Sequence, residues 1–512
     1  MRQTRPTQLP PVPATDLATL VGAQMTPHSE AVEVHGVTLR SADVRPGDLF
    51  AALPGANTHG IRFAAAAVAA GAVAILTDAA GASAVSDVEG PLVLVVPDPR
   101  AVLGRVCVAV YGDPSRRLSV LGVTGTNGKT TTSYLLEAAL RAAGQLPGLI
   151  GTIETRMQTA NGLVAAPAQR TTPEAPDLQA TLALMAEKGI RSVAMEVSSH
   201  ALALDRVAGT TFEVAGFTNF SQDHLDFHGD LESYFAAKAL LFDGRAAHEV
   251  VMVDDDWGAR LVGPDTVTVS AAGSVRAHWH SSEVSTPAGQ TTFVAHGPAG
   301  VSLPIRLSLP GHFNVANALL ALAMLDSAGV DVEQAARGLE AARVPGRMEV
   351  IDQGQPFTVV VDYAHTPAAV ATVLHALRAR TDGALILALG CGGDRDPGKR
   401  PLMGRVAARG SDVLIITDDN PRSEDPAVIR AAMRTGAQDL EAGQRGEILE
   451  IAGRASAIGA AVERAEAGDT VVIAGKGHEQ GQEIAGVIAP FDDRQVVRAV
   501  LTGLGWTGGS RP

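Results

Sequence analysis

The chain has 512 residues, 46% of them hydrophobic, and a formal net charge of −14 at pH 7. This length is too great for one hydrophobic core, so roughly two to four domains are expected. The acidic balance argues against nucleic acid as a partner, because phosphate backbones attract basic surfaces.

The chain shows no sign of export or of membrane insertion. The most apolar run, 64–76, is shorter than the roughly 20 residues that a membrane span needs. The N-terminus lacks a secretory signal pattern, and two cysteines, Cys107 and Cys391, are too few for a disulfide framework. We expect a cytoplasmic protein that acts as a monomer, without a membrane span and without a nucleic-acid partner.

Turn signals and apolar runs predict a separate N-terminal domain. Residues 1–30 look irregular, whereas short apolar runs alternate with turns over 32–96 and predict a small α/β module. A helix is expected within 97–117, followed by a proline-bearing joint. We therefore place the N-terminal domain at 1–116.

The rest of the chain predicts two further α/β domains. Over 117–344, β-rich runs alternate with helical patterns, which is typical of a mostly parallel sheet with helices on both faces. Within it, 265–308 is expected to be a β-rich insertion and 311–330 a buried helix. After Pro345-Gly346, four apolar strands separated by helices predict a doubly wound, Rossmann-like domain over 345–512. The predicted fold class is α/β with three domains.

The segment LSVLGVTGTNGKTTTSYLL, which begins at Leu118, carries the strongest functional signal. An apolar strand, a glycine-bearing turn and a helix N-terminus together form a cradle of backbone N–H groups for phosphate. Lys129 would reach the β- and γ-phosphates, and the Thr130 hydroxyl would hold Mg²⁺. Val123 stands where the strict pattern has glycine, so the loop is a variant, and an ordinary glycine-rich turn is the alternative. The predicted ATP-binding residues of this loop are Gly125, Thr126, Asn127, Gly128, Lys129, Thr130 and Thr131.

Lysine is scarce in this chain. Of 41 basic residues only five are lysines, at positions 129, 188, 238, 399 and 476. A chain that uses arginine for ordinary positive charge retains lysine where a compact ammonium or a deprotonable amine is required. Of the five, only Lys188 looks like a surface residue.

Acidic and histidine side chains follow two strands of the central domain. Glu196 ends the apolar run SVAMEV, where a doubly wound sheet places groups that bind Mg²⁺. Asp223-His224 follows the strand-like FEVAGFTNF, and Lys238 lies on the next expected helix. A polar surface loop is the alternative, but the density of Asp, His and Asn favours a metal and phosphate site.

Polar loops also follow the strands of the C-terminal domain. Arg347 is suited to pairing with a phosphate and Asp362 to holding a ribose hydroxyl. The loops 391–401, 418–426 and 475–479 lie at strand C-termini, which is the usual ligand edge of such a sheet. Their arginines would bind carboxylates and Glu479 an ammonium, which predicts a pocket for a zwitterion, unless these are solvated loops without a ligand.

Nine motifs together resemble the Mur ligase family. TGTNGKTT, MEVSSHAL, FTNFSQDHLDFHG, GHFNVANA, PGRME, DYAHTP, GCGGDRD, DNPR and GKGHE occur in this order along the central and C-terminal parts. The N-terminal PGDLFAALPGANTHG is similar to the uridine-nucleotide domain of the same family, so the resemblance covers nearly the whole chain. It implies an N-terminal domain for the uridine nucleotide, a central ATP-binding domain and a C-terminal amino-acid-binding domain.

The resemblance implies an ATP-dependent amide ligase of peptidoglycan precursor synthesis, with Mg²⁺ as its cofactor. ATP would phosphorylate the D-glutamate γ-carboxylate of UDP-N-acetylmuramoyl-L-alanyl-D-glutamate. The amine of an amino acid would then attack the acyl phosphate, releasing phosphate. Catalysis of this kind depends mainly on positioning and charge neutralisation. The implied partners are the UDP-N-acetylmuramoyl dipeptide, ATP and the amino acid.

Matching motif positions imply roles for individual residues. Lys129, Lys238 and His224 would be catalytic. The metal ligands would be Thr130, Glu196, His224 and Lys238, the last as a carbamate, which requires a neutral primary amine that arginine cannot supply. Further ATP contacts would come from Asn317, Arg347 and Asp362. The UDP-substrate would contact Ser41, Thr171, Thr172, Ser198 and Arg206, although Arg40-Ser41-Ala42 departs from the Asp-Ser-Arg of the family.

The amino acid itself is the harder question. Asp419-Asn420-Pro421-Arg422 resembles the form associated with meso-2,6-diaminopimelate, whose second carboxylate requires a cation. Arg395 and Arg422 would bind that carboxylate, and Gly475 and Glu479 the distal ammonium. L-Lysine and L-ornithine lack the second carboxylate, so diaminopimelate is favoured and the two diamines remain alternatives.

Two more distant alternatives remain. A folylpolyglutamate synthase would share the central and C-terminal domains, but it has no counterpart of 32–96, and DNPR does not suit it. A P-loop switch or assembly ATPase would hydrolyse nucleotide without depending on an amino acid, and it leaves the arginine-bearing loops unexplained.

Overall fold

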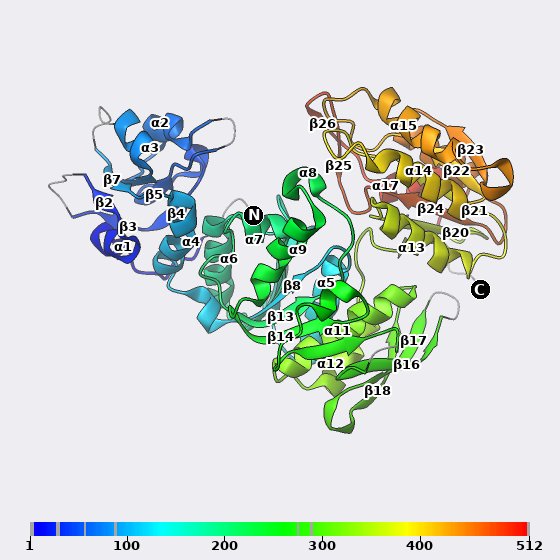
Figure 1. The fold of residues 1–512 in the computed structure, drawn as a ribbon, viewed down its shortest axis with the longest axis horizontal. Helices are drawn as coiled ribbons and strands as arrows, with labels where there is room; N and C mark the ends of the chain where they lie inside the picture. Colours follow the sequence, from blue (N-terminus) through cyan, green and yellow to red (C-terminus); the bar gives the residue numbers. More distant parts are fainter. Residues whose placement is uncertain are drawn as a thin grey trace.

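The computed structural model describes residues 5–26, 31–55, 58–85, 90–273, 276–286 and 290–508. Figure 1 shows three parts in chain order, with the central part between the N-terminal and C-terminal ones. Each part contains a β-sheet of its own. No helix in the described ranges is long and apolar enough to cross a membrane.

The N-terminal part is a small α/β module. Within its described residues, five strands pair in the order β2-β7-β6-β5-β4, and β4 to β7 run parallel. The strands are β2 (Gln24–Met25), β4 (Gly36–Thr38), β5 (Asp48–Ala51), β6 (Ala74–Thr77) and β7 (Leu92–Val95), beside the short pair β1 (Val12–Pro13) and β3 (Glu33–Val34). The helices are α1 (Ala14–Val21), α2 (Ala64–Ala69), α3 (Ala79–Ala84) and α4 (Pro99–Val110).

The prediction that residues 1–30 are irregular was wrong. Helix α1 occupies eight of them, buries Leu17 and ends at Gly22, whose φ of 68° is left-handed. A helix this short gains little from local propensity. Its stability comes from Leu17, which packs in the N-terminal core with Leu103 of α4, and a local sequence pattern does not reveal that contact.

The N-terminal segment also contacts the central part. The backbone N–H and the hydroxyl of Thr7 donate to the Glu187 carboxylate at 2.7 and 2.9 Å. Glu187 is the last residue of α6 (Ala175–Glu187). This contact ties the N-terminal residues to the helix that faces the N-terminal module.

The central part is built on a large, mostly parallel sheet. Counting described residues, eleven strands pair in the order β11-β10-β9-β12-β8-β13-β14-β15-β16-β17-β18, and they run parallel from β9 to β16. The parallel strands are β8 (Ser119–Thr124), β9 (Pro147–Ile150), β12 (Ser192–Glu196), β13 (Phe212–Phe217), β14 (Ala246–Met252), β15 (Val267–Ser270) and β16 (Trp279–Ser285). The antiparallel strands at the two ends are β10 (Glu154–Thr159), β11 (Gly162–Pro167), β17 (Thr291–His296) and β18 (Ser302–Leu307). Strands β15 to β18 lie in the predicted β-rich insertion.

Helices cover both faces of this sheet, as predicted. On one face, α5 (Lys129–Ala142), α11 (His312–Ser327) and α12 (Val332–Leu339) share one hydrophobic core with Leu121 and Val123 of β8. On the other face, α6 packs on Val120 of the same strand. The predicted buried helix within 311–330 is confirmed as α11. The remaining helices are α7 (Ser199–Ala203), α8 (Leu225–His228), α9 (Leu231–Ala239) and α10 (Asp256–Ala259).

The C-terminal part is the predicted doubly wound sheet. In the described segments, six strands pair in the order β19-β20-β24-β21-β22-β23, parallel except for β19. They are β19 (Glu349–Val350), β20 (Thr358–Asp362), β21 (Leu385–Leu389), β22 (Val413–Ile416), β23 (Glu447–Glu450) and β24 (Thr470–Ala474), with a separate hairpin of β25 (Gly481–Ile484) and β26 (Val487–Pro490). Sequence analysis found four of the six and missed β19 and β23, which are short edge strands with polar residues.

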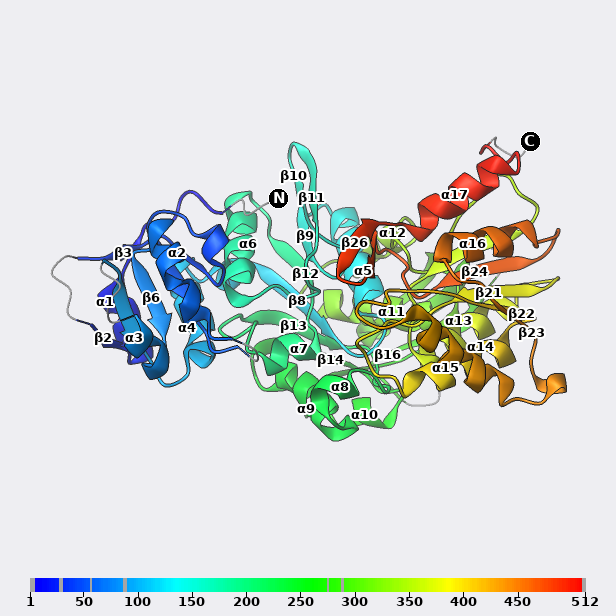
Figure 2. The same ribbon diagram turned by 90° about the horizontal axis from the view of Figure 1, so that it is seen from above.

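Helices lie on both faces of the C-terminal sheet. Figure 2 shows α14 and α15 on one face and α16 and α17 on the other. The helices are α13 (Pro367–Arg378), α14 (Lys399–Gly410), α15 (Pro426–Gln438), α16 (Arg454–Glu463) and α17 (Asp493–Gly503). The predicted α/β class with a Rossmann-like C-terminal domain is confirmed.

A fully buried ion pair holds the C-terminal ends of two strands together. The Arg454 guanidinium donates to both carboxylate oxygens of Asp493 at 2.7 and 2.6 Å, and neither side chain is exposed. It also donates to the carbonyls of Ala474, at the end of β24, and Asp418, just after β22. The pair therefore supports two of the loops that follow the sheet.

We predict that Asp493→Ala destabilises the protein by about 3–5 kcal/mol, because it leaves a buried guanidinium unpaired. Asp439→Ala is the matched control, since Asp439 pairs with Arg405 on the surface and such pairs contribute about 0–1 kcal/mol. Urea unfolding monitored by circular dichroism measures both. Equal losses of stability in the two variants would contradict the prediction.

Candidate active site

The loop between β8 and α5 has the backbone geometry of a phosphate cradle. Gly125 and Gly128 have positive φ angles of 142° and 91°. A Cβ at Gly125 would lie 1.9 Å from the Thr218 hydroxyl oxygen, and one at Gly128 would lie 2.3 Å from Oδ1 of Asn317. Both glycines are therefore required by conformation and by close packing.

The variant position of the loop has a structural explanation. Val123 is fully buried in β8 and belongs to the core under α5 and α11. The loop itself is supported from the neighbouring strand, because Asn219 accepts the N–H of Asn127 at 3.0 Å through its side chain and that of Thr126 at 2.9 Å through its backbone. These hydrogen bonds hold the loop backbone, and the buried Val123 fills the core where the strict pattern has glycine.

Lys129 and Thr130 are the first two residues of α5. The Lys129 ammonium donates to the carbonyls of Gly125 and Thr126 at 2.8 and 2.9 Å, and burial lowers its pKa. The Thr130 hydroxyl donates to the Glu196 carboxylate at 2.9 Å. The predicted loop residues and Glu196 are therefore brought together.

Glu196 is held in place by a residue that sequence analysis missed. Thr152 donates its backbone N–H and its hydroxyl to the two carboxylate oxygens, at 2.8 and 2.9 Å. Thr152 follows β9, and no motif marked it.

The fit of Mg²⁺ to this site can be judged from the donor atoms. Among the described residues there is no group of three His, Cys, Asp or Glu side chains that could hold a metal ion. When phosphates and waters supply most of its ligands, Mg²⁺ needs only one or two from the protein. The Thr130 hydroxyl and the Glu196 carboxylate, which are 2.9 Å apart, can supply these. The residues present fit a magnesium ion that arrives with a nucleotide.

His224 and Lys238 line the same cavity as the phosphate loop. His224 has a left-handed φ of 52°, and burial lowers its pKa to about 3, so its ring is neutral. Lys238 is almost fully buried in α9, donates to the Gly125 carbonyl at 2.7 Å and lies 4.3 Å from the centre of the Tyr234 ring. Burial lowers the pKa of Lys238 well below that of an ordinary lysine, which favours the neutral amine.

The three predicted nucleotide-contacting residues outside the loop line a second cavity of about 310 Å³ between α11 and the C-terminal part. Arg347 lies over the Tyr363 ring at 4.2 Å and donates to the Thr130 hydroxyl at 3.3 Å. Asp362 accepts the N–H groups of Met348 and Ala364, both at 2.7 Å. Asn317 donates to Asn314 within α11. Asp362 thus stabilises the turn that carries Arg347, and its proposed contact with a ribose stays a prediction.

The residues predicted for the UDP-substrate are only partly brought together. Thr171, Ser198 and Arg206 line the cavity of the phosphate loop, which has a volume of about 380 Å³. Thr172 is fully buried behind it, where its hydroxyl donates to the Glu196 carbonyl and accepts the N–H of Ser198. Thr172 therefore stabilises the wall of the cavity and does not line it.

Ser41 lies apart from the other four, in a short 3-10 helix (Ser41–Asp43) of the N-terminal module. A cavity of about 300 Å³ between this module and α6 is lined by its neighbours Arg40 and Asp43. Ser41 is not among the residues that line it, so the structure does not join Ser41 to the predicted site.

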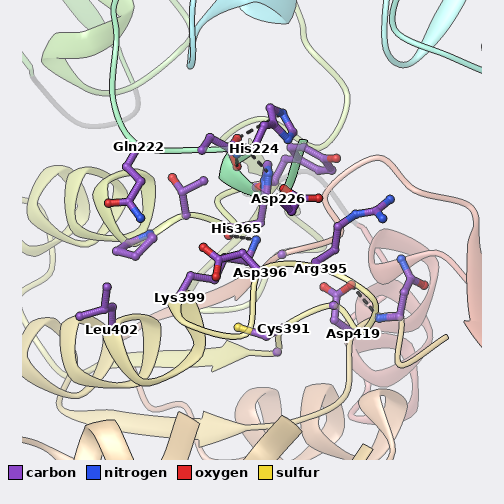
Figure 3. A pocket seen from close by; sticks show the side chains of 18 of the residues that line it. Gln222, His224, Asp226, His365, Cys391, Arg395, Asp396, Lys399, Leu402 and Asp419 are labelled. Carbon is purple, nitrogen blue, oxygen red and sulfur yellow. Dashed lines mark hydrogen bonds and ion pairs between the residues drawn. The ribbon is translucent and has the colours of Figure 1, made fainter. Parts of the chain in front are cut away.

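All six residues predicted to bind the amino acid line one cavity of about 420 Å³ between the central and C-terminal parts. They are Arg395, Asp419, Asn420, Arg422, Gly475 and Glu479. Figure 3 shows this cavity with His224 on one side, Cys391 and Asp419 on the other, and His365 between them. The loops that follow β21, β22 and β24 therefore converge as predicted.

The cavity lined by these six residues, which we call the amino-acid cavity after its predicted ligand, adjoins the phosphate-loop cavity. Both are lined by Asp223, His224, Tyr363, His365 and Arg395. The first two residues belong to the central part and the other three to the C-terminal part. The phosphate cradle and the charged pocket thus open onto a shared wall.

Three residues of that wall, Asp223, Tyr363 and His365, are not among the predicted site residues, although Asp223 stands in the loop whose composition favours a metal and phosphate site. The Asp223 carboxylate lies 3.4 Å from Nε2 of His224 and 4.0 Å from Nε2 of His365. Tyr363 packs against both Arg347 and His365. Asp223, Tyr363 and His365 stand inside quoted motifs, DHLD and DYAHTP, so their motif membership was the signal that could have identified them.

The fold and the site define a multidomain P-loop enzyme with a second, charged pocket beside its phosphate cradle. Family models match along most of the chain: "Mur ligase family, catalytic domain" at 33–111, "Mur ligase middle domain" at 123–325 and "Mur ligase, glutamate ligase domain" at 346–477.

Curated relatives match over nearly full length. A protein of Streptomyces coelicolor named UDP-N-acetylmuramoyl-L-alanyl-D-glutamate–2,6-diaminopimelate ligase is 50% identical, covering 97% of this chain and 98% of its own. A protein of Corynebacterium glutamicum with the same name is also 50% identical, covering 95% and 97%. The chain belongs to the Mur ligase family.

Solved structures agree with this assignment. One titled as a UDP-N-acetylmuramoyl-L-alanyl-D-glutamate–2,6-diaminopimelate ligase is 34% identical, with a TM-score of 0.63, and covers 93% of this chain and 96% of its own. MurF from Acinetobacter baumannii has a TM-score of 0.66 at 19% identity, covering 92% and 96%, and supports the fold alone.

Proposed function

We propose that this protein is an ATP-dependent, ADP-forming ligase that joins meso-2,6-diaminopimelate to UDP-N-acetylmuramoyl-L-alanyl-D-glutamate through an acyl phosphate. The observation that carries the proposal is the shared wall between the phosphate-loop cavity and the amino-acid cavity. A carboxylate at that wall can be reached by a phosphate from one side and by an amine from the other. The names of the two relatives with 50% sequence identity support the same activity.

In this proposal the central part activates the substrate carboxylate. Lys129 and Arg347 neutralise charge on the phosphates, and the loop N–H groups orient them. Thr130 and Glu196 would hold Mg²⁺, as would His224 and a carbamylated Lys238. When bound, Mg²⁺ would supply further neutralisation of phosphate charge. Thr171, Ser198 and Arg206 would orient the UDP-substrate so that its carboxylate faces the transferred phosphate.

The C-terminal part would supply the amine. Arg395 and Arg422 bind a carboxylate of the amino acid, and Glu479 binds its distal ammonium. The α-amine attacks the acyl carbon, the C–O bond to phosphate breaks, and the amine loses its proton as the amide forms. Amide, ADP and phosphate are the products.

We also propose the division of labour predicted from the sequence. The uridine nucleotide would bind the N-terminal domain, 1–116, the ATP the central domain, 117–344, and the amino acid the C-terminal domain, 345–512. Because ATP and UDP-linked sugars are cytoplasmic metabolites, the proposed location is the cytoplasm. Ser41 would contribute only if bound substrate brings the N-terminal domain closer.

The alternatives differ in substrate dependence. Ligation of L-lysine or L-ornithine would use the same site without a second carboxylate. A folylpolyglutamate synthase is at odds with the family match at 33–111, although one such structure shares the fold at 19% identity. A non-ligating ATPase would not require an amino acid at all.

Phosphate release in the presence of the UDP-muramoyl dipeptide, ATP and Mg²⁺ tests the proposal. We expect release that depends on the dipeptide and is strongest with meso-diaminopimelate, compared with lysine and ornithine tested separately. Mass spectrometry of the product would show the added residue. Phosphate release that depends on neither the dipeptide nor the amino acid would refute the proposed ligase activity.

We predict that Lys238→Arg lowers kcat on the order of 100-fold while the protein stays folded, because a guanidinium cannot form a carbamate. Lys188→Arg is the matched control, since Lys188 is exposed. Steady-state kinetics and thermal unfolding measure the two effects. Turnover like that of the unsubstituted protein would exclude a carbamate at Lys238.

We predict that Arg422→Ala raises the KM for diaminopimelate by about 10- to 100-fold, the effect of losing a charge-assisted hydrogen bond. The KM for ATP should change by less than about twofold, because the nucleotide lies in other cavities. Arg405→Ala, on the surface of α14, is the control. Similar increases in both KM values would rule out a carboxylate contact at Arg422.

A further inference from the structure

Lys476 is one of the five lysines of the chain, and the proposed mechanism gives it no role. It follows β24 in the GKGHE motif, and its side chain is completely buried. Its ammonium donates to Oδ1 of Asn420 at 2.9 Å and to Oε2 of Glu479 at 2.7 Å. Both partners line the amino-acid cavity.

The contact with Lys476 determines which way the Asn420 amide points. An ammonium can only donate, so the atom of Asn420 that faces it must be the amide oxygen. The backbone N–H of Glu483 donates to the same oxygen at 3.1 Å. The amide nitrogen is therefore turned toward Glu479, to whose Oε2 it donates at 2.8 Å. The amide nitrogen carries a second hydrogen and makes no other hydrogen bond among the described residues, so Asn420 has a donor left for a ligand of the cavity that it lines.

The same contacts fix the orientation of Glu479. Its Oε2 accepts from both Lys476 and Asn420, whereas among the described residues nothing donates to its Oε1. The side chain is 30% exposed, so this second oxygen is accessible to a ligand. Glu479 thus presents a fixed acceptor beside the donor of Asn420.

We propose that Lys476 is a positioning residue that sets the hydrogen-bond polarity of the amino-acid cavity, and thereby selects an amino acid whose far end carries both a carboxylate and an ammonium. The inference rests on the proposed ligase function and deepens it. Arg422 lines the same cavity and supplies a further donor for a carboxylate. Without Lys476, the Asn420 amide could rotate and Glu479 would lose its main partner.

The variant Lys476→Met removes the ammonium at similar volume. We expect the KM for diaminopimelate to rise about 10-fold or more, with the KM values for ATP and the UDP-substrate within about twofold. Selectivity for diaminopimelate over lysine, as a ratio of kcat/KM values, should fall about fivefold or more, because lysine has no second carboxylate for Asn420 to bind. Lys188→Met is the matched control and should leave both quantities unchanged.

A double-mutant cycle tests whether Lys476 acts through Glu479. In a Glu479→Gln background, Lys476→Met should raise the KM for diaminopimelate by a smaller factor than it does alone, because the part of its effect that passes through Glu479 is already lost. Independent, multiplying effects would overturn the inference, as would equal increases in all three KM values. If the unsubstituted protein does not ligate diaminopimelate, the proposed function fails instead.

A second variant covers the case in which Lys476→Met does not fold. Asn420→Asp keeps an acceptor for Lys476 but replaces the amide donor with an acceptor. It should therefore lose the selectivity for diaminopimelate over lysine while thermal unfolding shows an intact fold. Selectivity that is unchanged in Asn420→Asp would overturn the inference.

Discussion

The buried carboxylate of Glu196 holds the central site together. It accepts from Thr130 at the start of α5 and from both donors of Thr152 after β9, and its backbone carbonyl accepts from Thr172. Four segments that are distant in the sequence thus meet at one residue at the end of β12. A carboxylate is suited to this position because it accepts several hydrogen bonds at once. A side chain that accepted only one hydrogen bond would leave the remaining buried donors unpaired.

The segment Pro345-Gly346, which precedes the C-terminal sheet, connects the amino-acid site with the phosphate site. A Cβ at Gly346, whose φ is 64°, would lie 2.1 Å from the backbone nitrogen of His478. This segment is therefore pressed against the loop that carries Lys476 and Glu479. One residue later, Arg347 reaches the Thr130 hydroxyl. A phosphate that binds Arg347 would thus pull on the same short segment that contacts the loop carrying Lys476 and Glu479.

The sequence was sufficient to predict an element or a site where the local residue pattern and the chemistry of its side chains point to the same structure. The phosphate loop, the helix at 311–330 and the converging C-terminal loops follow from periodicity and from the rule that ligands bind at strand C-termini. Helix α1 was missed because its stability depends on a tertiary contact of Leu17. Thr152 was missed because a lone threonine in a turn carries no motif. Thr172 was found as a motif position, but its buried contacts with the backbone appear only in three dimensions.

The scarcity of lysine has a physical explanation in the structure. The side-chain nitrogens of Lys129, Lys238 and Lys476 are buried, each within 2.9 Å of an oxygen acceptor, and Lys399 lines the amino-acid cavity. Burial of a charge is costly unless it is paired, and the broad guanidinium of arginine needs more acceptors than these sites provide. Lys188, the remaining lysine, is exposed, and an arginine there would meet no such restriction. In a chain that otherwise prefers arginine, the four lysines other than Lys188 are therefore positions where a compact ammonium or a free amine is needed, and this reasoning directs attention to Lys476.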